Sequence, residues 1–195
     1  MAHNVLVVPV PELEPFVLER THHYDSSFVS ADPDFGHAHI SALGPFLDDP
    51  SEADLALVGD IARRTPAFDF TLDLMGEFQH GLIYLHPEPD APFRELTRQL
   101  VASFPQCPPY GGAFPEPVPH LTLDQRAEGI DLASVRVALG DAVPARCRAD
   151  RLVLARYANH DCRVLAEWKL STTPRNRGLP PLRSSSPRFR GDPGS

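Results

Sequence analysis

The chain has 195 residues, of which 42% are hydrophobic, 23% charged and 8% aromatic, a composition typical of a soluble globular protein. It contains no apolar run near the ~18 residues of a membrane-spanning helix and no basic leader before its first hydrophobic segment, so we expect neither a membrane span nor a secretory signal. Its three cysteines lack CxxC spacing, which argues against a disulfide framework and a zinc knuckle and favours a cytoplasmic location.

Charge divides the chain into an acidic body and a basic end. Residues 175–195 contain five arginines and one aspartate, so the formal charge of −8 for the whole chain becomes −12 for residues 1–174. A body this acidic is unsuited to non-specific binding of long nucleic acids, which depends on neutralising phosphates. Because residues 175–195 are rich in Pro, Ser and Arg without hydrophobic periodicity, we expect a single domain spanning 1–174 and then a disordered tail. A basic arm that recruits RNA is the alternative interpretation of this tail.

Strand-like and helix-like hydrophobic patterns alternate along the domain. Residues such as Phe68, Phe70 and Leu72 alternate with polar residues and predict a strand, whereas Phe93 and Leu96 begin an apolar stripe with helical spacing. In chain order we expect a strand at 5–10, a helix at 11–24, a strand at 37–43, a helix at 51–64, a hairpin at 68–74 and 82–86, a helix at 90–104, a loop rich in proline and glycine at 105–117, a strand at 119–123, a helix at 131–143 and a hairpin at 151–157 and 163–170.

The order strand, helix, hairpin occurs twice in this series, first in residues 37–86 and again in residues 119–170. The order is similar although most residues differ. This pattern predicts an α+β fold built from a duplicated unit. Because a duplicated unit tends to place equivalent residues around a pseudo-twofold axis, residues that match between the copies should lie near one another.

The residues that match are polar. The first strand contains the sequence HISA at 39–42, and the second contains HLTL at 120–123, 81 residues further on. Alternate residues of a strand share a face, so His39 and Ser41 should point to one side, as should His120 and Thr122. Either triplet alone occurs by chance in many proteins, but two copies on similar strands, each followed by a comparable helix and hairpin, favour a functional role.

Two histidines with neighbouring hydroxyls suit an in-line displacement at phosphorus. Attack and departure occur on opposite sides of the phosphorus, so one proton-transfer group is needed on each side. Histidine, whose unperturbed pKa is near ~6.5, serves as either acid or base near neutral pH. Hydroxyl donors on the same strands can hold the non-bridging oxygens. Such a site needs no metal and no cofactor if protein groups supply these functions.

With these residues the chain resembles the two-histidine phosphoesterases, which carry paired H-x-[ST]-hydrophobic motifs and include bacterial 2′-5′ RNA ligases and 2′,3′-cyclic nucleotide phosphodiesterases. The resemblance covers residues 3–173 and implies a bilobal α+β fold of antiparallel sheets with flanking helices around a central cleft. It also implies metal-independent catalysis by His39 and His120, with Ser41 and Thr122 binding the substrate phosphate. By the same resemblance, His120 is the base and His39 the acid.

The leading functional hypothesis is hydrolysis of 2′,3′-cyclic phosphates on nucleotides or RNA ends to 2′-phosphates. The substrate, a cyclic nucleotide or RNA end, is then the only partner we expect, and the protein should be a monomer that needs no membrane. Ligation of RNA ends through a 2′-5′ linkage is an alternative reaction on the same fold. A module that binds nucleotides or RNA ends without turnover is an alternative from another class.

Several other residues have two interpretations. His37 shares the predicted strand face of His39 and is either a neighbour that contacts substrate or tunes His39, or an ordinary half-exposed histidine; we expect no metal at this pair, because no acidic third ligand follows. Tyr110 and Phe114, in the loop before the second motif, either stack on a nucleobase or fold onto the body. Arg126 and Arg156 either meet a phosphate or form surface ion pairs.

The remaining side chains have structural interpretations. We expect His80, His86 and His160 to be solvated near hairpin turns, and Trp168 to pack against the core or at an edge of the sheet.

Overall fold

The computed structural model describes residues 2–113 and 117–172, so the predicted tail at 175–195 and Phe114 lie outside the described residues. The strands of the described residues are β1 (His3–Pro9), β2 (His39–Phe46), β3 (Phe68–Glu77), β4 (Leu82–Glu88), β5 (Leu121–Gln125), β6 (Ala145–Ala149), β7 (Arg151–Tyr157) and β8 (Arg163–Lys169). The α-helices are α1 (Glu14–Tyr24), α2 (Glu52–Arg64), α3 (Ala91–Ser103) and α4 (Leu132–Leu139). Short 3₁₀ turns lie at Pro11–Leu13, Ser26–Phe28, Pro109–Gly112 and Gly140–Ala142.

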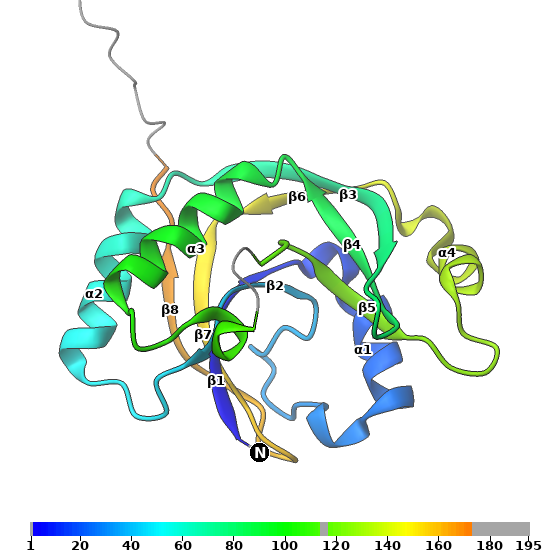
Figure 1. Ribbon diagram of the computed structural model, residues 1–195, viewed down its shortest axis with the longest axis horizontal. Coiled ribbons are helices and arrows are strands. Elements are labelled where there is room, and N and C mark those ends of the chain that lie inside the picture. The colour runs from blue at the N-terminus through cyan, green and yellow to red at the C-terminus, as the bar shows by residue number, and fades with distance from the viewer. Residues whose placement is uncertain (1, 114–116, 173–195) are drawn as a thin grey trace, which may run out of the picture.

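Within the described residues the strands form one curled antiparallel sheet in the order β6-β3-β4-β5-β2-β1-β7-β8 (Figure 1). Neighbouring strands pair over several residues except at the centre, where the register of β2 and β5 consists of one pair, Ile40 opposite Leu121. The sheet is therefore two four-stranded halves that meet at the two motif strands. This arrangement confirms the α+β fold with antiparallel strands in two lobes.

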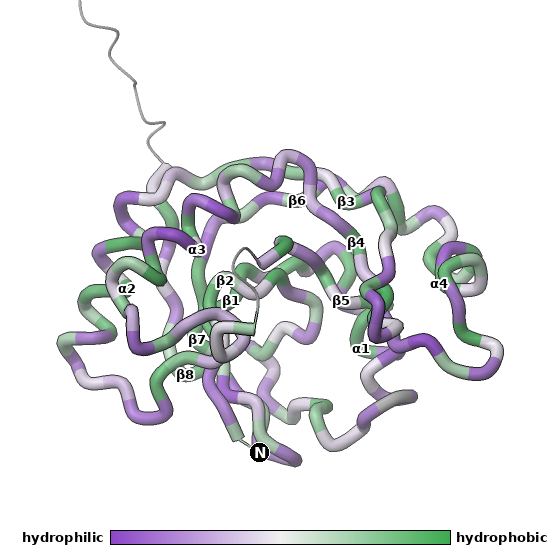
Figure 2. Tube along the Cα trace, in the orientation of Figure 1, coloured by the Kyte–Doolittle hydropathy of each residue, from purple (hydrophilic) through white to green (hydrophobic). Residues whose placement is uncertain are grey.

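The two sequence copies are interleaved rather than stacked side by side. The hairpin β3–β4 from the first copy lies beside β5, whereas the hairpin β7–β8 from the second copy lies on the side of β2, separated from it by β1. The helices of the two copies do not cross over, because α2 packs near β8 in the half that contains β2, and α4 packs near β3 in the half that contains β5 (Figure 1). Helices α1 and α3 pack near β5 and β2. Figure 2 shows hydrophobic and hydrophilic residues alternating along α2, α3 and α4, as expected for helices that cover a sheet.

Two hydrophobic clusters, one on each face of β1, are present in the described part of the chain. Leu6 and Val8 of β1 belong to the main core under the helices, while Val5 and Val7 belong to a smaller cluster that also contains Phe35. Burial on both faces explains why β1 is a continuous apolar run instead of an alternating one. The smaller cluster lies on the face of the sheet that carries the polar residues of the first motif, since Val7 pairs with Ser41.

The predicted elements are present, with shifted ends and one addition. The strand expected at 37–43 begins at His39, which leaves His37 in the preceding bend, and the helix expected at 131–143 ends at Leu139 before a 3₁₀ turn. Strand β6 was not predicted; it is only five residues long, and small buried side chains at Ala145, Cys147 and Ala149 alternate with exposed residues as it pairs with β3. No helix among residues 2–113 and 117–172 is both long and apolar enough to cross a bilayer.

Candidate active site

The two motifs lie next to each other at the centre of the sheet. Ile40 and Leu121 oppose each other and are buried in the main core. In an antiparallel pair with this register, the flanking residues set His39 opposite Thr122 and Ser41 opposite His120, all on the other face. Each of these four side chains is half-buried. The structure therefore brings the four residues singled out from the sequence onto one face, with each histidine across from the hydroxyl of the other strand.

Both histidines are oriented by the same local hydrogen bond. The Nδ1 atom of His39 lies 2.8 Å from the carbonyl oxygen of His37, and the Nδ1 atom of His120 lies 2.7 Å from that of Val118. A carbonyl oxygen only accepts, so Nδ1 carries the hydrogen in each ring and Nε2 is left as the atom that can exchange a proton. Each motif histidine is thus bound to the backbone carbonyl of the residue two positions before it.

The surroundings make both imidazoles harder to protonate than usual. Burial lowers the pKa of His39 to about 4, helped by the nearby charge of His120, while the carbonyl of His37 and the carboxylate of Glu14 act in the opposite direction. Burial also lowers the pKa of His120, and the charges of His80 and His86 lower it further. Near pH 7 both rings are therefore neutral, with an Nε2 lone pair, when the site is empty.

A pocket of about 230 Å³ lies beside His39, with Ser41, Tyr110 and Tyr157 in its lining. The hydroxyl of Tyr157 lies 3.1 Å from Nδ1 and 3.4 Å from Nε2 of His39, and the two rings are tilted with centroids 5.5 Å apart. Tyr157 ends β7, 118 residues from His39 in sequence. Sequence reasoning missed this residue, because only the order of strands in the sheet brings β7 to the first motif.

A larger pocket of about 460 Å³ lies beside His120 and has aromatic walls. Phe78 stacks on Tyr84 with ring centroids 4.3 Å apart and on His80 with centroids 5.7 Å apart. It forms a T-shaped contact with His120, whose ring centroid is 5.0 Å away. Tyr110 lines this pocket as well as the one beside His39, and its side chain is hydrogen-bonded to that of Ser41. Tyr110 is therefore placed at the site, between the two pockets.

Other candidate residues lie elsewhere or act indirectly. Arg126 pairs with Glu77 and Arg156 with Asp161, so both form surface ion pairs as one interpretation predicted. The described linings of the two pockets include no Arg or Lys. His80 is exposed as expected but belongs to the His120 pocket, a role that its place in a turn did not reveal.

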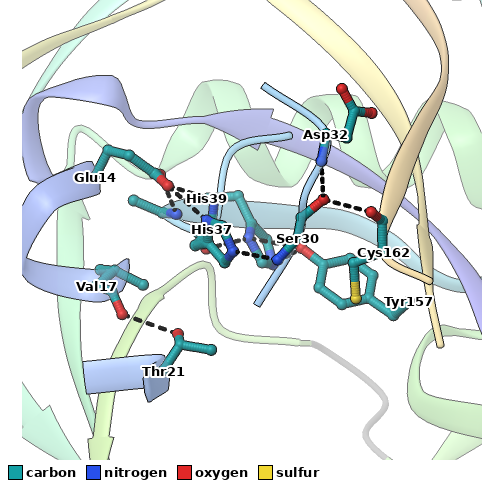
Figure 3. Close-up of polar contacts among 10 residues, drawn as sticks. Glu14, Val17, Thr21, Ser30, Asp32, His37, His39, Tyr157 and Cys162 are labelled. Atoms are coloured by element: carbon teal, nitrogen blue, oxygen red, sulfur yellow. Dashed lines mark hydrogen bonds and ion pairs between the residues drawn. The ribbon is translucent and has the colours of Figure 1, made fainter. Parts of the chain in front are cut away.

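His37 does not share a strand face with His39. It precedes β2, its side chain is 7% exposed, and its Nδ1 atom is bound to the carboxylate of Glu14 (Figure 3). The prediction that it lies on the strand was wrong, because β2 begins two residues later. Within the described residues, no three His, Cys, Asp or Glu side chains gather as a group that could hold a metal ion.

Comparison with known proteins gives the family. The model of the 2′-5′ RNA ligase superfamily matches residues 9–161, and the chain belongs to this family. The fold is similar to that of E. coli LigT complexed with 3′-AMP, at 17% identity and a TM-score of 0.58, covering 86% of this chain and 97% of that one. It is also similar to TT0787 of Thermus thermophilus, at 20% identity and a TM-score of 0.53, covering 86% and 97% of the two chains. No curated protein sequence matches the chain. These findings confirm the resemblance to the two-histidine phosphoesterases.

Proposed function

We propose that the protein is a metal-independent phosphodiesterase that hydrolyses 2′,3′-cyclic phosphates of nucleotides or RNA ends to 2′-phosphates. The observation that carries the proposal is the pairing of two H-x-[ST] motifs on one face of the sheet, with Nδ1 of both histidines held by a carbonyl and Nε2 left for chemistry. One imidazole on each side of a phosphorus is the arrangement that an in-line displacement needs.

In the proposed reaction each of the four motif side chains has one role. Nε2 of His120 takes a proton from water as the water oxygen forms its bond to phosphorus. The bond between phosphorus and the 3′ oxygen breaks, and Nε2–H of the protonated His39 donates its proton to the departing oxygen. Meanwhile the hydroxyls of Ser41 and Thr122 donate hydrogen bonds to the non-bridging oxygens, where negative charge accumulates. The products are a 2′-phosphate and a free 3′-hydroxyl, and the two histidines have exchanged protonation states.

The pockets support a nucleotide as the substrate. The larger pocket is lined by the rings of Phe78, His80 and Tyr110 next to His120, and aromatic side chains of this kind can stack on a nucleobase. Because the described pocket linings carry no Arg or Lys, a singly charged phosphodiester suits them better than a polyphosphate. Similar structures of E. coli LigT hold 3′-AMP, NADP+ and ATP, which also favours a nucleotide ligand.

Hydrolysis of 2′,3′-cyclic mononucleotides in the presence of EDTA tests the proposal, with ³¹P NMR to identify the product. We expect turnover that survives EDTA and yields only the 2′-phosphate, since the protein supplies both proton-transfer groups. A 3′,5′-cyclic nucleotide is the matched control and should remain intact. Activity lost in EDTA, a 3′-phosphate product, or no turnover of any 2′,3′-cyclic substrate would contradict the proposal.

Ligation is the second candidate, favoured by the two pockets on either side of Tyr110, one beside each histidine. Two nucleosides flanking one phosphorus would each have a place there. In this reaction a 5′-hydroxyl replaces water as the nucleophile. Adding RNA with a 5′-hydroxyl end to the same assay distinguishes the two, because ligation gives a longer RNA with a 2′-5′ linkage.

Titration of the two histidines gives a second prediction. Because both pKa values are lowered, with that of His39 near 4, the rings should become protonated only as the pH falls below about 6.5, and kcat/KM should peak on the acid side of that value. Bound inorganic phosphate should raise both pKa values, since an anion between the rings favours the imidazolium. Histidine NMR titration with and without phosphate measures this. The exposed His22 is the internal control, and equal responses of His22 and the two site histidines would count against an anion site.

A further inference from the structure

Glu14, in the first turn of α1, holds the backbone immediately before the first motif (Figure 3). Its Oε1 atom accepts hydrogen bonds from the backbone N–H of His37 at 3.0 Å and from Nδ1 of His37 at 2.7 Å, and its Oε2 atom accepts one from the backbone N–H of Ala38 at 2.7 Å. Although burial opposes ionisation, these bonds keep the pKa of Glu14 below its ordinary value. Glu14 is therefore a carboxylate anion with three fixed donors.

The hydrogen bonds of His37 show which of its ring nitrogens carries the hydrogen. Its Nε2 atom lies 3.1 Å from the backbone nitrogen of Ser30, and a backbone N–H can only donate, so Nε2 is the acceptor and carries no hydrogen. Its other ring nitrogen then carries the hydrogen given to Glu14. Both nitrogens of the neutral His37 ring are thereby used to hold the segment in place, which leaves neither for substrate.

One peptide unit connects Glu14 to His39. The carbonyl of His37 and the N–H of Ala38 belong to the same planar trans peptide, and they point in opposite directions. Glu14 binds the N–H end of this unit, and Nδ1–H of His39 is bound to the carbonyl end. A carboxylate on the N–H polarises the peptide, which makes its carbonyl a stronger acceptor. The anion thus both fixes the direction of the carbonyl and strengthens its bond to the imidazole.

The second motif has no such anchor. Nδ1–H of His120 is bound to the carbonyl of Val118, but the next residue is Pro119, whose nitrogen carries no hydrogen. No carboxylate can hold that peptide by its N–H. The two motif histidines therefore differ although their motifs are nearly equivalent. The peptide that binds His39 is held at its N–H by the Glu14 carboxylate, whereas the peptide that binds His120 has no N–H.

We propose that Glu14 is a positioning residue for His39, which it holds in the Nδ1–H tautomer and whose imidazolium it stabilises through the peptide between His37 and Ala38. An imidazolium donates a stronger hydrogen bond through Nδ1–H than a neutral ring, so an acceptor held by an anion favours the protonated form. An acid role for His39 rests on the proposed hydrolysis. The link from Glu14 to the tautomer and protonation of His39 stands without it.

Glu14→Gln tests the proposal, because it keeps the size of the side chain and removes its charge. We expect kcat to fall about 10- to 100-fold, less than for loss of the histidine itself, with KM changed less than about twofold. The pKa of His39, followed by NMR, should fall further because an anion is lost, whereas that of His120 should stay the same. Glu19→Gln, an exposed change on the same helix, is the matched control and should alter neither quantity.

Other titratable groups near His39 have to be accounted for in this measurement. They come from the bend before β2, from the neighbouring motif, from the 3₁₀ turn at Pro109–Gly112, and from β7 and β1, and they are His37, His120, Tyr110, Tyr157 and His3. None of these groups is substituted in Glu14→Gln, and of them only His37 contacts residue 14, so a shift in the pKa of His39 that is absent from His120 reports the lost carboxylate. Lost activity with an unmoved His39 pKa would overturn the proposal and leave a purely structural role.

The wild-type protein provides a further test that needs neither turnover nor a folded variant. Imidazole ¹⁵N shifts should show His39 in the Nδ1–H tautomer, and the Ala38 amide should exchange slowly with solvent because Glu14 holds it. An Nε2–H tautomer of His39, or rapid exchange of the Ala38 amide, would contradict the proposal. If these features are present and no 2′,3′-cyclic substrate is hydrolysed, the proposed function fails while the link from Glu14 to His39 remains.

Discussion

Replacing His39 or His120 with alanine is expected to lower kcat on a 2′,3′-cyclic mononucleotide by about 10²- to 10⁴-fold, the range for loss of a general acid or base. Each ring lines its own pocket, with Nδ1 bound to a carbonyl and Nε2 available, so neither histidine can replace the other. The double variant should lose little more than the worse single variant, since the two groups act in one step. Steady-state kinetics in EDTA measure kcat for the two single variants and the double variant.

His22→Ala is the matched control for these substitutions. It changes an exposed histidine on α1 and should leave kcat unchanged.

Binding of a 2′-mononucleotide by the alanine variants distinguishes an enzyme from a binding module. An enzyme that has lost its acid or base retains affinity within about an order of magnitude while turnover collapses. Activity that persists in either single variant would contradict the two-histidine mechanism.

Replacing Asp124 with alanine is expected to lower the free energy of unfolding by about 3–5 kcal/mol, the range for breaking a buried ion pair by removing one partner. Asp124 is 1% exposed, directly follows the second motif on β5, and forms an ion pair with Arg20 of α1. Its Oδ1 atom also accepts a hydrogen bond from the backbone N–H of Gln125 at 2.8 Å. Urea denaturation followed by circular dichroism measures the change.

Asp69→Ala provides the comparison, because Asp69 pairs with Arg148 on the surface, where the two side chains are 76% and 53% exposed. Its loss should cost no more than about 1 kcal/mol. The double variant Arg20→Met/Asp124→Leu should recover most of the stability lost in Asp124→Ala, since no charge is then buried alone. Equal effects of Asp124→Ala and Asp69→Ala would show that the buried pair contributes no more than a surface pair.

Features set by short-range spacing could be predicted from the sequence. The motif residues share a face because alternate positions of a strand do, and that rule needs no knowledge of other strands. The order of helices and hairpins follows for the same reason, since hydrophobic periodicity is local. The roles of His39, His120, Ser41 and Thr122 in the reaction stay predictions.

Features set by the order of strands could not be predicted in this way. Tyr157 reaches His39 because β1 lies between β2 and β7, and periodicity carries no information on which strands are neighbours. Glu14 is an ordinary first-turn acid in the sequence, and only the bend before β2 reveals what its carboxylate binds. The prediction that His37 lies on the strand was wrong because the strand begins two residues later, and a shift of this size is usual for strand boundaries predicted from sequence.

The single residue pair between β2 and β5 has a mechanical consequence. Sheet hydrogen bonds do little to fix the spacing of the two motifs, so that spacing depends on the main hydrophobic core and on any helix that spans both halves. Helix α1 does so, because it packs on β5, is joined to that strand through Arg20, and binds the entry to β2 through Glu14. Helix α1 therefore helps to hold the two halves of the sheet together, and loosening it would let the distance between the two imidazoles vary while the main hydrophobic core, which joins both halves, stayed folded.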